Sequence, residues 1–248
     1  MIAYDQIDTL FLDAGNTLVS IDFGRVAAEL ANRGVPSSAE AISRAEAASR
    51  PAVSAVFAKG DSSEGLNPFE ALLLGIFSRL EEVPDGDRAA ELAAALGPIL
   101  LTPGHSDLLW RAVMPGVREA LQSFTDDGLR LVVVSNSDGT VEQNLKDRGL
   151  DVYFSHIVDS KVIGIEKPDP RIFGYALEIS GARKESTVHV GDMYFADIEG
   201  ARRAGLAAIL LDPFDDWHEV DCPKTPDLIT LAKSIREAKD DGASSKGR

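Results

Sequence analysis

Residues 9–18 read Thr9-Leu10-Phe11-Leu12-Asp13-Ala14-Gly15-Asn16-Thr17-Leu18, so a short apolar run ends on one aspartate and a Gly-Asn turn follows at once. An apolar run of this length, bounded by turn residues, predicts a buried strand. Gly and Asn readily adopt positive φ, so the chain is expected to bend directly after Asp13. Asp13 would then lie at the carboxyl end of a strand, where open α/β sheets bind their ligands. Taken alone, a turn aspartate is the simpler interpretation, so the prediction depends on later stretches.

Helices and strands are predicted to alternate after Met114-Pro115-Gly116. Such alternation favours βαβ units, and therefore an α/β fold with a parallel sheet and helices on both faces. The predicted helices cover residues 117–124, 140–147, 170–180, 195–204 and 225–238. The predicted strands cover residues 129–134, 156–158, 188–190 and 207–211.

Residues 21–111 are predicted to be almost wholly helical, with no convincing strand. Expected helices cover residues 25–32, 39–50, 69–82 and 87–96, with Pro51 bending or breaking the second, Asn67-Pro68 opening the third and Gly97-Pro98 ending the fourth. Residues 60–65 are expected to form a loop. The first predicted strand is separated from the other predicted strands by this helical block. A connection of this length between strands of one sheet indicates an inserted domain. We therefore expect a core of residues 1–20 and 112–238, a helical domain at 21–111, and a disordered polar tail at 239–248.

The composition is that of an ordinary globular protein, with 248 residues, of which 44% are hydrophobic and 26% charged. A formal net charge of −15 argues against a nucleic-acid partner, because such a protein repels the phosphate backbone. Cys222 is the only cysteine, so no intrachain disulfide can form, which suits a reducing compartment. We expect no signal peptide, because no basic region followed by an apolar stretch opens the sequence, and no apolar segment approaches about 20 residues. The expected location is therefore cytoplasmic, without a membrane partner.

A second apolar run ends on small polar residues, in Leu131-Val132-Val133-Val134-Ser135-Asn136-Ser137-Asp138-Gly139. The Ser135 hydroxyl and the neighbouring amides would supply neutral donors to an anion, although the same residues also suit a helix cap. A third stretch contains Lys167-Pro168-Asp169-Pro170, in which two prolines stiffen the loop. A lysine on a stiffened loop suits a phosphoryl oxygen or a group of carboxylates. The simpler alternative is a solvated lysine.

A fourth stretch, Val188-His189-Val190-Gly191-Asp192-Met193-Tyr194-Phe195-Ala196-Asp197, ends another predicted strand on an aspartate. Asp192 would lie at the strand tip and Asp197 in the first turn of the next helix. Two acids close to Asp13 need a cation to relieve their repulsion, and hard oxygen ligands suit Mg²⁺. Separately, the two acids are also explained as a helix cap and a helix-dipole residue. It is the combination of four such stretches that indicates a site.

In the order and spacing of these four stretches, the chain resembles the haloacid dehalogenase (HAD) superfamily. Residues 13–18 resemble the first motif of the superfamily, Ser135-Asn136 the second, Lys167-Pro168-Asp169-Pro170 the third, and Gly191-Asp192 with Asp197 the fourth. The resemblance covers about residues 7–18 and 114–211. It implies a three-layer, Rossmann-like core, and the helical block resembles the first class of cap in the family.

The resemblance implies a Mg²⁺-dependent phosphatase that acts on a small phosphorylated metabolite. Asp13 would attack phosphorus and form an aspartyl-phosphate, which water then hydrolyses. Mg²⁺ would be held by Asp13, the Gly15 carbonyl and Asp192, with Asp197 in support. The resemblance further implies that Ser135, the Asn136 amide and Lys167 hold the phosphoryl group.

The chain departs from the family pattern at Gly15, where family phosphatases usually carry an aspartate that protonates the leaving group. General acid–base help is typically worth about 10²–10⁴-fold in rate, so hydrolysis is expected to be weak or to borrow an acid. His105, Asp107 and Glu70 are conceivable sources of that acid. The same departure keeps alternatives open: a hydrolase of C–halogen or C–P bonds, or a binding or regulatory protein of the same fold.

The resemblance implies that a C–P hydrolase of this superfamily would use a cap lysine as an imine former, and Lys59 is the only lysine of the predicted cap. A helix C-terminal cation is its simpler explanation. The sequence predicts neither the natural substrate nor a choice between monomer and homodimer.

Overall fold

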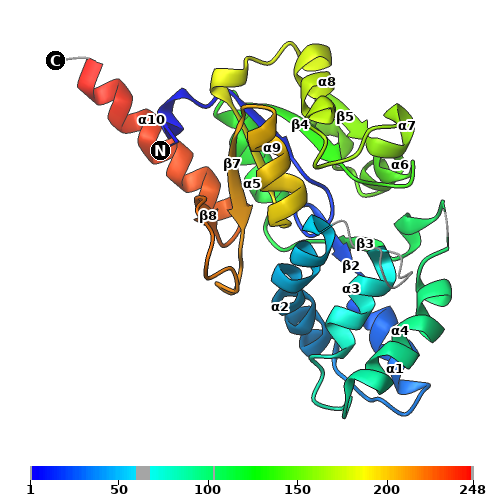
Figure 1. Cartoon of the computed structure of the whole chain (residues 1–248). Helices are drawn as coiled ribbons and strands as arrows, with labels where there is room; N and C mark the ends of the chain where they lie inside the picture. The colour runs from blue at the N-terminus through cyan, green and yellow to red at the C-terminus, as the bar shows by residue number, and fades with distance from the viewer. Residues whose placement is uncertain (1, 60–67, 103, 247–248) are drawn as a thin grey trace.

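The computed structural model describes residues 2–59, 68–102 and 104–246. Its centre is a parallel sheet (Figure 1). The six strands of this sheet lie in the order β5-β4-β1-β6-β7-β8. The strands are β1 (Thr9–Leu12), β4 (Arg130–Ser135), β5 (His156–Asp159), β6 (Thr187–Gly191), β7 (Ala207–Leu211) and β8 (Lys224–Thr225). Strand β1 is central, because Leu12 pairs with Val133 of β4 on one side and with Val190 of β6 on the other.

Helices cover both faces of this sheet and make it the middle of three layers. Leu10 and Leu12 pack into one apolar cluster with α5 (Val117–Asp126), α6 (Val141–Asp147) and α10 (Leu228–Lys246). Phe11, between them, packs into another cluster with α8 (Pro170–Ser180) and α9 (Gly200–Arg203). Neighbouring strand residues point to opposite faces. The predicted α/β, three-layer, Rossmann-like fold is confirmed.

Short helical segments connect the main elements. They are η1 (Tyr4–Gln6), η2 (Ser106–Leu108), η3 (Asp151–Tyr153), α7 (Ser160–Ile163), η4 (Lys184–Ser186) and η5 (Tyr194–Glu199). Segment η5 is a π-helix, so the single helix predicted for residues 195–204 is instead a π-helix followed by α9. The Asp197 carboxylate accepts a hydrogen bond from the backbone N–H of Met193 at 2.9 Å, which ties the start of this segment.

Within the described residues, the four helices between β2 and β3 form a separate group, which we call the insert (Figure 1). They are α1 (Phe23–Ala31), α2 (Ala39–Ala58), α3 (Pro68–Phe77) and α4 (Gly86–Leu100). Asp22, Ser38 and Asp85 cap α1, α2 and α4 by accepting backbone hydrogen bonds. The insert has its own apolar cluster, which includes Leu30, Ile42, Leu73, Phe77 and Leu92.

The expectation of no strand near the helical block is wrong at both of its edges. Strand β2 (Val19–Ile21) pairs antiparallel with β3 (Trp110–Val113), joining Val19 to Val113 and Ile21 to Trp110. The two segments that connect the sheet to the insert therefore run side by side, and their backbone N–H and C=O groups hydrogen-bond to each other. Domain boundaries at 20/21 and 111/112 would cut through this strand pair.

Two helices continue through residues that were expected to end or bend them. Helix α2 includes Pro51, and α4 includes Gly97 and Pro98. Buried Arg50 and Val53 lie within two residues of Pro51, and buried Leu96 and Leu100 within two residues of Pro98. Packing of these side chains opposes the roughly 3 kcal/mol that an interior proline costs a helix. Helix α3 ends at Phe77, before the predicted residue 82. The loop predicted at 60–65 and the cap predicted at Asn67 lie outside the described residues.

The last helix, α10, continues to Lys246, so the disordered tail predicted at 239–248 is wrong for residues 239–246. Helix α10 packs against η1 near the start of the chain, and this contact supports the added turns. No described helix combines the length and the hydrophobicity that a membrane span requires.

Candidate active site

Asp13 lies at the carboxyl end of the central strand, where the predicted site residues of three other segments also gather. Its backbone N–H donates to the Val190 carbonyl at 2.9 Å, which fixes it beside β6. Lys167 Nζ donates to Asp13 Oδ1 and to Asp197 Oδ1, each at 2.6 Å. Asp13, Lys167 and Asp197 are all buried, and Asp13 is the most exposed of the three at 8%. The carboxylate at the strand tip is thus held by a buried lysine.

Burial disfavours the charged forms of Asp13, Asp197 and Lys167, and the neighbouring charges change their pKa values further. Burial and the neighbouring Asp197 raise the pKa of Asp13, although Lys167 opposes the rise. Burial would also raise the pKa of Asp197, but Lys167 and His189 overcome it and hold this pKa below its usual range. Burial would lower the pKa of Lys167, but Asp13 and Asp197 raise it. Asp197 and Lys167 are therefore a stable ion pair, and Asp13 is the less satisfied carboxylate.

Asp197 is engaged on both of its oxygens. Oδ1 accepts from Lys167 and lies 3.0 Å from His189 Nε2, and Oδ2 accepts from Met193 N–H. In this geometry Asp197 contacts Lys167, His189 and the Met193 backbone at once. His189 lies inside β6 and is fully buried, and the sequence analysis did not identify it.

Asp192 follows β6 and joins a second group of polar side chains. Its Oδ2 accepts from Asn16 Nδ2 at 3.1 Å and lies 3.2 Å from Arg50 Nε. Arg50 also binds Glu46, with Nη2 donating to Oε2 at 2.7 Å, and Asn16 Nδ2 donates to Glu46 Oε1 at 2.9 Å. Glu46 and Arg50 come from helix α2, so the insert reaches the site. Burial raises the pKa of Asp192 to about 7 against the lowering effect of Arg50, and Asp13 and Asp197 add to the rise.

Ser135 and Asn136 lie at the end of β4, beside β1. Ser135 is the last residue of the strand and is buried. The Asn136 side chain holds the backbone of Lys167, with Nδ2 donating to the Lys167 carbonyl at 2.9 Å and Oδ1 accepting from its N–H at 2.7 Å. The Lys167-Pro168 peptide bond is cis. Asn136 therefore positions the lysine loop through its side chain.

The group fits a divalent cation by its donor chemistry and its charge. Asp13, Asp192 and Asp197 each place a carboxylate oxygen within 4.8 Å of the others. Hard oxygen donors of this kind suit Mg²⁺. Around them, the buried carboxylates are Asp13, Glu46, Asp192 and Asp197, and the buried cations are Arg50 and Lys167. With all four carboxylates ionised, the group has an excess of two negative charges, which a divalent cation would relieve.

The space beside Gly15 is taken by Trp110 of strand β3. A Cβ atom added at Gly15 would lie 3.2 Å from Cζ3 of the Trp110 ring, closer than nearly all real Cβ contacts. Position 15 therefore lacks an acid, and the Trp110 indole packs beside it.

The sequence analysis missed Asn16, Glu46, Arg50 and Trp110. Glu46 and Arg50 are spaced i, i+4 in a predicted helix, but this spacing is also typical of a solvated ion pair. Of the conceivable acids, Glu70 lies in the insert beside Gly97, and exposed His105 and partly buried Asp107 lie near η2. Lys59 is the exposed C-cap residue of α2, which confirms the simpler explanation for it.

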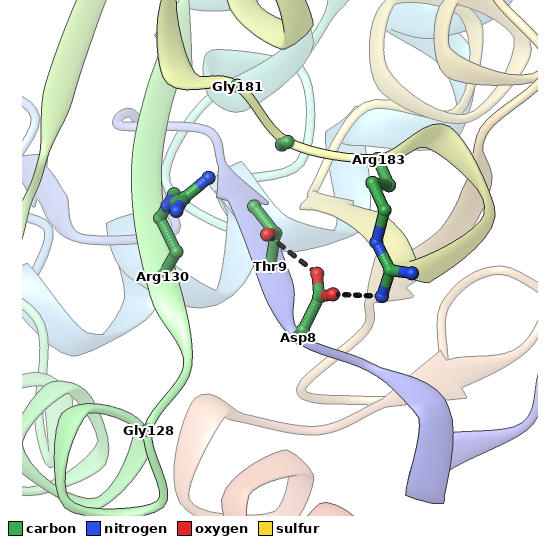
Figure 2. A pocket seen from close by; sticks show the side chains of 7 residues that line it. Asp8, Thr9, Gly128, Arg130, Gly181 and Arg183 are labelled. Carbon is green, nitrogen blue, oxygen red and sulfur yellow. Dashed lines mark hydrogen bonds and ion pairs between the residues drawn. The ribbon is translucent and has the colours of Figure 1, made fainter.

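A cavity of about 260 Å³ lies at the opposite edge of the sheet (Figure 2). It is lined by residues that precede or begin β1 and β4, including Asp8, Thr9 and Arg130, and by Arg183. Arg183 pairs with Asp8 at 2.8 Å, and Arg130 donates to the Ser180 carbonyl at 2.7 Å. The cavity lies at the amino ends of β1 and β4, whereas the Asp13 group lies at the carboxyl ends of the strands, so the two sites are separate.

Comparison with known families decides the class of this site. A model described as haloacid dehalogenase-like hydrolase matches residues 7–205. The chain belongs to this family of hydrolases. The match spans all four motif stretches.

Two curated relatives show how far the similarity extends. Haloacid dehalogenase-like hydrolase domain-containing protein 3 of Xenopus laevis is 38% identical over 135 residues, or 54% of this chain and 53% of that protein. Glyceraldehyde 3-phosphate phosphatase of Methanothermobacter thermautotrophicus is 38% identical over 100 residues, or 40% of this chain and 44% of that protein. The chain spans about half the length of the curated relatives it matches.

A solved structure supports the fold. The HAD hydrolase YfnB of Bacillus subtilis, in a magnesium-bound crystal form, aligns with a TM-score of 0.61 at 20% identity. The alignment covers 92% of this chain and 98% of that one. This likeness concerns the fold alone.

Proposed function

We propose that this protein is a Mg²⁺-dependent phosphomonoester hydrolase that acts on a small phosphorylated metabolite, with Asp13 as the nucleophile. The observation that carries the proposal is the buried carboxylate group with its excess negative charge, in which Asp13 lies at the end of the central strand beside Lys167. Relatives named as phosphatases, such as glyceraldehyde 3-phosphate phosphatase, support the same reaction class.

In the proposed reaction, a carboxylate oxygen of Asp13 forms a bond to phosphorus while the bond to the leaving alkoxide breaks. Water then attacks the aspartyl-phosphate, releases inorganic phosphate and restores Asp13. The Ser135 hydroxyl and the Asn136 backbone amide would each donate to a phosphoryl oxygen. Lys167, held by Asp197 and by the Asn136 side chain, would neutralise charge on the nucleophile and the phosphoryl group.

The metal-holding residues in this proposal are Asp13, the Gly15 carbonyl and Asp192. Mg²⁺ bound there supplies charge neutralisation at the phosphoryl group. Asp197 acts through Lys167, because both of its oxygens already accept hydrogen bonds.

The insert is proposed to act as a cap over this site. Helix α2 contacts the core through Arg50 to Asp192, Glu46 to Asn16 and Arg44 to Asp216. Ser54 of the same helix also accepts at its Oγ from Phe195 N–H at 2.9 Å. A cap in this position would exclude water and bring its own side chains to the substrate.

Gly15 is the observation that favours another function, because it removes the usual proton carrier. Cleavage of a C–halogen bond needs no such acid and, in metal-free form, no divalent cation. A binding or regulatory role needs neither. The retained group of Asp13, Lys167 and Asp192 argues against loss of catalysis, and the excess negative charge argues against metal-free chemistry.

The test is hydrolysis of p-nitrophenyl phosphate, whose good leaving group needs little help from an acid. We expect turnover with Mg²⁺, none with EDTA, and a loss on the order of 10³-fold or more for Asp13→Asn. Asp8→Asn is the matched control, since Asp8 lies on the same segment at the opposite edge of the sheet. It should keep full activity.

Turnover by Asp13→Asn at the wild-type rate would show that the nucleophile is assigned wrongly. A folded wild-type protein that binds Mg²⁺ but hydrolyses nothing would favour dehalogenation, phosphonate cleavage or a binding role.

A further inference from the structure

Arg50 links the insert to a carboxylate of the proposed metal site. Its side chain is buried on helix α2, and its Nε lies 3.2 Å from Asp192 Oδ2. The same guanidinium binds Glu46 one helical turn earlier, with Nε and Nη2 both donating. Asn16, on the turn after β1, donates to Glu46 and to Asp192. We call Asn16, Glu46, Arg50 and Asp192 the latch cluster.

A guanidinium and a divalent cation on one buried carboxylate repel each other strongly, because little solvent screens them there. Arg50 now supplies Asp192 with the positive charge that a metal would supply. We propose that Arg50 is a latch that competes with the divalent cation for Asp192, so that metal binding weakens the hold of the insert on the core. This inference rests on the proposed function, in which Asp192 is a metal ligand.

The latch cluster keeps its charges paired in both states. When Arg50 leaves Asp192, its guanidinium still has Glu46, which is on the same helix and moves with it. Asp192 then has the cation, and Asn16 remains beside it. A buried charge left without a partner costs several kcal/mol, so an exchange that leaves none is accessible. The cluster is therefore a two-state element that the metal biases toward release.

The other contacts of α2 with the core provide a matched control. Arg44 binds Asp216 with distances of 2.7 and 2.8 Å and lies over the Phe214 ring. Arg44 and Arg50 are cations of one helix, and each ties that helix to the core. Only Arg50 touches a carboxylate of the proposed metal site.

The experiment titrates MgCl₂ into the wild-type protein, Arg50→Met and Arg44→Met by isothermal calorimetry. Removing a competing charged contact should tighten Mg²⁺ binding by Arg50→Met about tenfold or more. Arg44→Met, which carries the same loss of charge, should stay within about twofold of wild type. Equal affinities in Arg50→Met and wild type, or equal tightening in both variants, would overturn the latch.

A second measurement uses the wild-type protein and so does not depend on the folding of a variant. Amide hydrogen exchange is followed in helix α2 with and without Mg²⁺. The latch predicts faster exchange in α2 when Mg²⁺ is bound, because one of its contacts with the core is lost. Slower or unchanged exchange there would contradict it.

The outcomes separate the two proposals. If neither wild type nor Arg50→Met binds Mg²⁺, the proposed metal site and the latch both fail. If both bind it equally well, the proposed metal site stands and only the latch fails.

Discussion

At the scale of single residues, Gly15 and Trp110 lie together at the position where family phosphatases usually carry an acid. A Cβ atom at position 15 would lie 3.2 Å from the Trp110 ring, so the ring would have to shift by a few tenths of an ångström to admit it. Gly15 is not in the left-handed region of φ, so the backbone itself accepts an aspartate. What opposes an acid at this position is the ring from β3.

We expect Gly15→Asp alone to raise hydrolysis of an alkyl phosphate by less than about threefold, because Trp110 displaces the new carboxylate. Gly15→Asp combined with Trp110→Val should raise it by about tenfold or more, within the range typical of general acid catalysis. The measurement compares kcat/KM for β-glycerophosphate and p-nitrophenyl phosphate, with Trp110→Val as the control. An equal gain in the single and double variants would show that the ring does not hinder the acid.

Asp192 makes the stability of the metal-free protein depend on pH. Its folded-state pKa of about 7 lies above the ordinary value of 3.8, so the folded protein keeps a proton that the unfolded chain has lost between these values. The contribution of Asp192 to the free energy of unfolding therefore falls as pH rises through this window, and it is lowest above about pH 7.

Asp192→Asn should remove this loss. In EDTA, between about pH 5.5 and 8, the wild-type protein should lose on the order of 1 kcal/mol or more relative to the variant, or about 2–4 °C in Tm. Thermal unfolding at both pH values measures the difference. A variant that loses as much stability as wild type would show that Asp192 is already ionised at pH 5.5.

At the scale of elements, strand β6 and the π-helix η5 approach each other so closely that Gly191 is needed between them. A Cβ atom at Gly191 would lie 2.3 Å from Cγ of Asp197, a distance that real atoms do not tolerate. Asp197 is fixed there by Lys167 and by Met193 N–H. The glycine thus permits the ion pair that orients Lys167.

Gly191→Ala should lower the free energy of unfolding by about 2 kcal/mol or more, because Asp197 must leave its partners buried and unpaired. Gly174→Ala is the control. It lies on the exposed face of α8 with open space around a new Cβ, and it should stabilise the protein by about 0.5–1 kcal/mol. Urea unfolding of both variants measures the two effects. Equal stabilities would mean that η5 shifts without cost.

At the scale of the whole molecule, the formal net charge of −15 works against the folded state through mutual repulsion. Surface ion pairs such as Arg183–Asp8 and Arg171–Asp169 act in the opposite direction, but exposed pairs contribute only about 0–1 kcal/mol each. The repulsion involves many charges at long range, so it is expected to dominate.

Raising NaCl from about 0.05 to 0.5 M should therefore raise the Tm of the metal-free protein by a few degrees, because salt screens the repulsion. The measurement is thermal unfolding in EDTA, repeated with KCl to separate screening from a specific effect of sodium. A lower Tm at high salt would show that the surface ion pairs outweigh the repulsion.

The sequence determined the sheet and the residues at its edge. Asp13, Ser135, Lys167 and Asp192 were predicted because strand ends and turns are encoded locally, in apolar runs followed by residues with special backbone preferences. Parallel strands then bring their carboxyl ends to one edge, so the meeting of these residues follows from the fold class.

Only the tertiary structure decided what surrounds that edge. Arg50 contacts Asp192 and Trp110 covers Gly15 across long sequence separations, and no local pattern encodes either contact. Glu46 and Arg50 have the spacing of a solvated pair, yet they are buried because helix α2 packs against η5. The same packing carries α2 through Pro51. Local preferences are worth about 1–3 kcal/mol each, whereas burial of several side chains exceeds them, so the fold outweighs the pattern at these positions.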